Sequence, residues 1–293
     1  MAATRRRPSR YPMPQEDAYR RVLQRRAQLI GTMLIEQALP LIEDAKEREA
    51  LLRMDALSPE EDARLSAVLG PEPLWYADGN LVAVSPAEMN LGSYRADADA
   101  RFVADLLALV ERMRGAVVQA FPFDPARVMP FARGVDTKVS KTLARDLGRS
   151  VVRDESTARH LRLWAGQNAD RVTGFSQQML DDIARGTVKA VRQGLPASDL
   201  AKVLRQRLGM SKRRAAYIAR DQIGSLNGQI TKARQVAAGI SRYRWSDSGD
   251  SRVRPLHEEM NGNVYSWATG APEEGGQNPG EPHACRCVAL PER

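Results

Sequence analysis

The residues best suited to metal chemistry gather near the end of the chain. Both cysteines of the 293-residue sequence, Cys285 and Cys287, lie in the stretch GEPHACRC at residues 280–287, together with His283. His257 lies 26 positions before His283. Zinc is bound by thiolate and imidazole groups, usually four of them. Residues two apart in an extended chain point to the same face, so both thiols could reach one soft metal ion.

Two other roles stay open for the cysteine pair. Zinc-binding cysteines are usually separated by two to four residues, and His283 is very close to Cys285 for three ligands from one short segment. A disulfide between Cys285 and Cys287 would close a strained ring, and a reducing compartment works against it. Without a metal, the thiols would act as small buried side chains that close a sheet. Zinc is therefore a candidate cofactor, with His257, His283, Cys285 and Cys287 as its ligands.

A second group of reactive side chains lies in DSGDSRVRPLH, residues 247–257. A nuclease-like enzyme could use His257 as acid and base, Arg254 to hold an anion and Asp250 to orient the histidine. The alternative is a turn in which Asp250 accepts backbone N–H groups and pairs with Arg252 or Arg254. The spacing matches no catalytic motif, and Walker, H-x-x-x-H and paired-carboxylate motifs are absent from the sequence. The turn is favoured, and we do not expect an enzyme.

A long helix is predicted to position both groups. Within residues 211–238, apolar positions recur at 4-3-4-3-4 spacing, which indicates one buried face. They are Ala219, Ile223, Leu226, Ile230, Ala233 and Ala237. A polar stripe lies one residue further on and contains Arg220, Gly224, Asn227, Thr231 and Arg234. Arg220 and Asn227 are expected at the edge of the core, where they would hold backbone groups of the segment that follows.

That segment, residues 239–293, reads as a small sheet. In ISRYRWSD (240–247), Tyr243 and Trp245 would share one face of a strand. NVYSW (263–267) and RCVAL (286–290) are the second and third candidate strands. About 50 residues bury little core alone, so this sheet needs the helix before it, a metal or a partner.

The rest of the chain is predicted to be mainly helical. Residues 1–14 read as a basic flexible arm, and 15–55 as a helix kinked at Pro40. SPEE at 58–61 is a capping box for a short helix ending near Gly70. Residues 71–94 read as an irregular connection with at most a short strand at Leu81–Val84. The spacing of apolar residues from Phe102 to Phe121 predicts another helix.

These elements indicate an α+β fold, with a long helix leading into a small C-terminal sheet. Proline and glycine at 121–134 suggest a joint, and the predicted domains are 15–135 and 136–293. Helices are expected over 155–238, with breaks at Gly194-Leu-Pro and at Gly209-Met.

The charge balance favours polyanionic partners. The formal net charge is +8, with 44 Lys and Arg against 36 Asp and Glu. Residues 211–244 contain eight basic residues and one acidic residue, Asp221. Such an excess is typical of non-specific, salt-sensitive contact with double-stranded DNA, and it also fits a solvated face. The candidate phosphate-binding residues are Arg5, Arg6, Arg7, Lys212, Arg213 and Arg214. The sequence shows neither a signal peptide nor a membrane span, so synthesis in the cytoplasm is expected.

The C-terminal third resembles the phage Mu protein F-like head morphogenesis family, also called phage minor head proteins. The resemblance covers about 190–291. It consists of the ARDQ–N helix (219–227), the Y-x-W strand (243–245), the D-x-R-V-R-x-x-H turn (250–257) and the closing PGEP-x-x-CRC (279–287). It marks Arg220, Asp221, Asn227, Tyr243, Trp245, Asp250, Arg252, His257, Cys285 and Cys287 as motif residues.

The resemblance implies a virion protein inside the capsid, present in few copies near the portal. Portal protein and major capsid protein would be its partners, and its roles would be head assembly and DNA packaging or delivery. Some relatives carry Cys-x-x-Cys where this chain has Arg254-Pro-Leu-His257. Because arginine does not bind metals, a four-ligand zinc site would here require His283.

Overall fold

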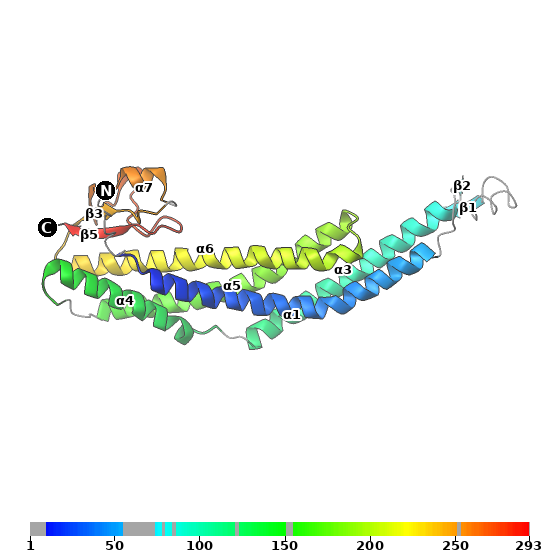
Figure 1. The fold of residues 1–293 in the computed structure, drawn as a ribbon, viewed down its shortest axis with the longest axis horizontal. Coiled ribbons are helices and arrows are strands. Elements are labelled where there is room, and N and C mark those ends of the chain that lie inside the picture. Colours follow the sequence, from blue (N-terminus) through cyan, green and yellow to red (C-terminus); the bar gives the residue numbers. More distant parts are fainter. Residues whose placement is uncertain are drawn as a thin grey trace, which may run out of the picture. The chain divides into compact units, whose positions relative to one another are not determined.

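The computed structural model describes residues 10–54, 74–77, 80–83, 86–120, 123–150, 155–250 and 253–292 (Figure 1). These residues are mostly helical, with a small antiparallel sheet near the C-terminus, as the sequence predicts. The long helices are α1 (Met13–Met54), α3 (Pro86–Ala120), α4 (Pro125–Leu147), α5 (Glu155–Arg192) and α6 (Ala197–Ala237). None of the described helices is long and apolar enough to cross a membrane.

The chain divides into two compact units, each made of separate stretches of sequence. One unit comprises Met1–Gln28, Ala120–Ser176 and Met210–Arg293, and it contains all the described candidate site residues. The other comprises Leu29–Gln119 and Gln177–Gly209. It includes the hairpin of β1 (Leu74–Ala77) and β2 (Asn80–Ala83). The boundary predicted after residue 135 falls inside α4.

The stretch 121–134, predicted to be a joint, follows a border between the two compact units at Gln119 and Ala120, but it also contains the start of a helix, α4. Asp124 caps the helix by accepting the backbone N–H of Arg127 at 3.0 Å, and Pro125 occupies its first turn. A proline there removes a donor that has no helical partner in any case, so it begins the helix instead of breaking it. Helix α4 ends at Gly148, which has a left-handed backbone conformation.

Three further predictions of secondary structure need correction. Helix α6 runs unbroken through Gly209, because one glycine costs about 1 kcal/mol, less than the unsatisfied ends that a break would create. Helix α3 begins at Pro86, within the stretch expected to be irregular. Tyr11, assigned to the flexible arm, is buried. Residues 1–9 of that arm and the SPEE capping box lie outside the described residues.

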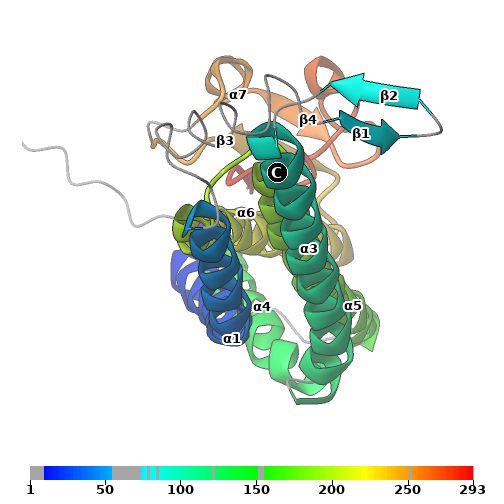
Figure 2. The same cartoon turned by 90° about the vertical axis from the view of Figure 1, so that its right-hand side faces the viewer.

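The C-terminal sheet has the strand order β4-β3-β5 and is antiparallel throughout. Strand β3 (Arg242–Ser246) pairs with β4 (Val264–Ser266) and with β5 (Val288–Glu292), which confirms three strands close to the predicted positions. The short helices α7 (Pro255–Glu259) and η1 (Pro272–Glu274) lie in its connections. The sheet and α7 lie along one side of the C-terminal part of α6 (Figures 1 and 2).

The core of this small subdomain is aromatic. It consists of Tyr243, Trp245, Met260, Tyr265, Trp267, Ala271, Cys285, Cys287 and Ala289. Gln235 of α6 ties it to the helix, since its side chain donates to the carbonyl oxygen of Ala289 at 2.9 Å and accepts from the indole N–H of Trp267 at 3.1 Å. The predicted dependence of the sheet on the preceding helix is thus visible in its contacts.

Candidate metal centre

Three of the four predicted metal ligands lie together. The Nδ1 atom of His257 is 3.8 Å from Sγ of Cys285 and 3.3 Å from Sγ of Cys287. One ligand atom from each residue lies within 4.8 Å of the others, and all three residues are buried. Both cysteines are free thiols, so the disulfide alternative is not what the structure contains.

The local fold aims the imidazole at the thiols. His257 lies on α7, and its ring packs in a T-shaped arrangement with Trp245 of β3, with ring centroids 5.2 Å apart. Its other nitrogen, Nε2, contacts the carboxylate of Glu274 in η1. A carboxylate on the far nitrogen of a histidine fixes the tautomer and ring orientation, and metal-binding histidines commonly have one. Glu274 was not among the residues that the sequence singled out.

The electrostatics of the group favour one thiolate. The pKa of Cys285 is lowered by hydrogen bonds from Cys287 and His257, although burial opposes this. The pKa of Cys287 is raised, because its proton is held by Cys285 and because it is buried. The pKa of His257 is raised by its hydrogen bonds to Cys285 and Glu274. The thiolate accepts hydrogen bonds from a thiol and from an imidazole. A metal cation could take the place of the two protons in these hydrogen bonds.

The donor set fits a soft or borderline metal ion. Two sulfur atoms and one nitrogen atom match the ligands of zinc, and three protein ligands leave the fourth position of a tetrahedron for another group. His283 does not join them. Its side chain is 86% exposed, and its Nδ1 lies 3.5 Å from the carboxylate of Asp221. The four-residue ligand set predicted from the sequence is therefore corrected to three residues that could hold a metal ion.

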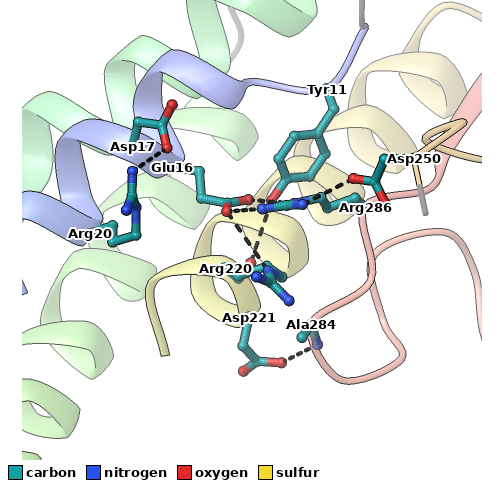
Figure 3. A network of polar contacts seen from close by, with 9 residues as sticks. All are labelled: Tyr11, Glu16, Asp17, Arg20, Arg220, Asp221, Asp250, Ala284 and Arg286. Atoms are coloured by element: carbon teal, nitrogen blue, oxygen red, sulfur yellow. Dashed lines mark hydrogen bonds and ion pairs between the residues drawn. The ribbon is translucent and has the colours of Figure 1, made fainter. Parts of the chain in front are cut away.

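Arg286, the residue between the two cysteines, fixes their segment to the opposite end of the chain. Its guanidinium donates to both carboxylate oxygens of the buried Glu16 in α1, with Nε 2.9 Å from Oε2 (Figure 3). A third contact joins its Nη1 to the carboxylate of Asp250 at 3.1 Å. The Glu16 carboxylate raises the pKa of Arg286 against the effect of burial. This buried ion pair was missed, because nothing in the sequence marks residues 270 positions apart as partners.

Helix α6 contacts the cysteine segment directly. The Asp221 carboxylate accepts the backbone N–H of Ala284 at 2.9 Å. A side chain at Gly224 would overlap the carbonyl oxygen of Cys285, and one at Gly228 would overlap that of Pro279. The helix and the cysteine segment are therefore in backbone contact, which only glycine permits at these two positions.

The other motif residues have mainly structural contacts. Tyr243 and Trp245 are fully buried, and Asn227 is nearly so. The Arg220 guanidinium lies 3.8 Å from Glu16. Asp221 and Gln235 hold backbone groups of the cysteine segment and of β5. Arg234, also in the polar stripe, forms a buried ion pair with Asp136 of α4.

The backbone N–H of Val253 donates to the carbonyl oxygen of Asp250 at 3.1 Å, which agrees with the turn favoured from the sequence. Asp250 pairs with Arg286, and Arg254 donates to the carbonyl oxygen of His283 at 2.6 Å. The side chains of Asp250, Arg254 and His257 thus each have a different partner. Arg252, Arg5, Arg6 and Arg7 lie outside the described residues.

Comparisons with known proteins match the part of the chain that contains these residues. Residues 181–290 match the family model described as phage Mu protein F like protein. A protein of Haemophilus influenzae, described as uncharacterized, is 35% identical over 124 residues, which make up 42% of this chain and 27% of that relative. The chain thus matches about a quarter of the length of this relative. No solved structure matches.

Proposed function

We propose that this chain, whose residues 181–290 form a phage Mu protein F-like domain, is a minor head protein that acts in phage head morphogenesis. The observation that carries the proposal is the family match. It spans all of α6, most of the small sheet, and His257, Cys285 and Cys287, so it covers most of the features that build the candidate centre.

The protein acts inside the capsid, in contact with the portal protein or the major capsid protein, and takes part in DNA packaging or delivery. Assembly takes place in the host cytoplasm. The net charge of +8 supports proximity to packaged DNA, since basic surfaces attract polyanions without regard to sequence. The long helices supply extended surfaces for protein contacts.

The metal in this proposal is a zinc ion held by Cys285, Cys287 and His257. A bound zinc would supply a structural crosslink, because ligation in a small domain contributes directly to folding free energy. The protein's own residues orient that group: Glu274 fixes the imidazole, and Arg286 holds the cysteine segment against α1.

The role is structural and does not include turnover. The nuclease alternative required Asp250 and Arg254 to act with His257. Asp250 instead pairs with Arg286, Arg254 with a backbone carbonyl, and His257 is only 2% exposed. A general acid or base must reach its substrate within hydrogen-bonding distance, which a buried imidazole does not.

Mass spectrometry of purified procapsids and virions tests the proposal. The expected result is that the chain is present in both, at a copy number well below that of the major capsid protein. Absence from both particles would refute a role as a head protein, whereas plasmid or RNA cleavage that is lost in His257→Ala would restore the enzymatic alternative.

A further inference from the structure

Helices α1 and α6 run antiparallel beside each other within the unit that contains the metal centre. The hydroxyl of Tyr11 donates to the carbonyl oxygen of Arg220 at 3.4 Å, and the side chain of Gln24 donates to that of Lys212, also at 3.4 Å. Residue numbers therefore rise along one helix as they fall along the other. Figure 1 shows the two helices side by side in this region.

The facing stretches of these helices carry only positive charge. Residues 18–28 contain four arginines and no acid, and residues 210–220 contain four Lys or Arg and no acid. Two of the eight point inward: Arg26 is buried against Ser176, and Arg220 reaches Glu16. Arg20 is paired with Asp17.

The remaining cations border the seam between the helices. Arg21 lies three residues before Gln24, whose side chain reaches α6, and Arg25 lies four residues after Arg21 on the same exposed face. Arg213 lies two helical turns before Arg220, so it is on nearly the same side of α6, next to α1. Tyr217, one turn on from Arg213, is 49% exposed. Among the described residues, Arg21, Arg25 and Arg213 form no ion pair.

We infer that Arg21, Arg25, Lys212 and Arg213 form a single surface, the α1/α6 basic surface, that binds the phosphate backbone of double-stranded DNA. Arginine dominates it, and the planar guanidinium group suits phosphate oxygens. The charge of the surface, rather than its apolar area, is the feature that favours a polyanion. The choice of DNA as the polyanion rests on the proposed function.

The inference adds the arginines of α1 to a basic cluster that the sequence placed on α6 alone. Sequence patterns point to Lys212, Arg213 and Arg214 as one cluster, but three consecutive residues of a helix point in different directions. The packing against α1 instead joins Arg213 to Arg21 and Arg25, which lie 192 and 188 positions earlier in the sequence. The surface is thus created by the same docking of α1 that holds Glu16 against Arg286.

The test uses the full-length protein and a random-sequence duplex, with binding followed by fluorescence anisotropy over a range of salt concentrations. One variant, R21Q/R213Q, removes an unpaired arginine from each helix. The matched control, R162Q/R185Q, removes two exposed arginines that are paired with Glu155 and Asp182. Both variants change the net charge equally, and thermal melting checks that both fold.

Each phosphate contact contributes about 0.9 to the slope of log affinity against log salt. R21Q/R213Q should therefore lower the slope by about two and weaken binding about 30-fold at 0.15 M salt. The control should bind within about threefold of the wild type, since its arginines make no phosphate contact.

Equal weakening of the two variants would overturn the inference, because it would mean that only net charge matters. Unchanged binding in R21Q/R213Q together with loss in R5Q/R6Q/R7Q would assign DNA contact to the N-terminal arm instead. Polyglutamate serves as a model of an acidic protein. If R21Q/R213Q lost binding to polyglutamate but kept its binding to DNA, the surface would be assigned to an acidic protein partner. Each of these results leaves the presence of the protein in heads, and with it the proposed function, to be judged separately by mass spectrometry.

Discussion

Glu16 and Asp17 are neighbours on α1 with very different surroundings. Glu16 is 2% exposed and pairs with Arg286, whereas the side chain of Asp17 is 40% exposed and pairs with Arg20. Removing one member of a buried ion pair leaves the other charge without its partner, while a surface pair contributes little. Glu16→Gln should therefore lower the free energy of unfolding by about 3 kcal/mol.

Asp17→Asn is the control, and it should change the free energy of unfolding by less than about 1 kcal/mol. Urea denaturation of both variants measures the difference. Similar values for the two variants would mean that the Glu16–Arg286 pair does not fasten the ends of the chain together.

The metal centre gives a second prediction at this scale. Protein purified without chelator and dialysed should contain about one zinc ion per chain. Cys285→Ser combined with Cys287→Ser should remove it, because the hydroxyl group is a poor zinc ligand. Glu274→Gln should weaken zinc binding about 10- to 100-fold, since this residue orients His257.

His283→Ala is the matched control for the zinc measurement. Its side chain is exposed and lies outside the three-residue group, so zinc content should not change. Elemental analysis decides between the outcomes. Loss of zinc in His283→Ala would restore the four-ligand set predicted from the sequence, and zinc-free wild-type protein would leave the thiols with a packing role.

At the residue scale, the sequence predicted three of the side chains that meet, wrongly added His283, and did not show what holds them. The meeting of His257 with Cys285 and Cys287 was predictable, because the motif that carries them is compact. Glu16, Asp136 and Gln235 were not, since each acts through a contact with a distant part of the chain. A carboxylate that will be buried looks the same in a sequence as one that faces solvent.

At the scale of elements, the decisive contact is the approach of α6 to the cysteine segment. Gly224 faces the carbonyl oxygen of Cys285, whereas a side chain at Gly209 of the same helix would meet nothing within 4 Å. Gly224→Ala should therefore destabilise the protein by about 1–3 kcal/mol through overpacking. Gly209→Ala should stabilise it by about 0.5–1 kcal/mol through the better helix propensity of alanine.

Thermal unfolding of the two glycine variants measures both effects. The expected changes in stability have opposite signs, so the two variants are easily distinguished. Stabilisation by Gly224→Ala would show that the cysteine segment does not contact α6. The sequence predicted this helix and its apolar face from periodicity. It gave glycines no such role, because a glycine in a polar stripe looks the same whether it faces solvent or another backbone.

At the scale of the whole molecule, the family domain depends on segments outside it. Residues 181–290 include α6 and most of the sheet but neither Glu16 of α1 nor Asp136 of α4, which pair with the buried Arg286 and Arg234. A fragment of residues 181–290 should therefore lack cooperative unfolding, because Arg234 would lose Asp136, Arg286 would lose Glu16 and keep Asp250, and the apolar face of α6 would be exposed.

Circular dichroism and hydrogen exchange of this fragment, compared with the full chain, check the prediction. Protection of β3 and β5 equal to that in the full-length protein would show that the C-terminal region folds on its own. The sequence placed a domain boundary along the chain, whereas the structure builds each compact unit from separated stretches. Such an arrangement follows from long-range packing, which periodicity does not reveal.

The most direct measurement of the proposed function is a cryo-EM reconstruction, without imposed icosahedral symmetry, of phage heads assembled in the presence of this chain. We expect density for the helices and the small C-terminal sheet inside the capsid at the portal vertex, absent from heads assembled without the gene. Density for the chain distributed over the whole capsid shell, or none in any part of the head, would contradict the role of a portal-associated minor head protein.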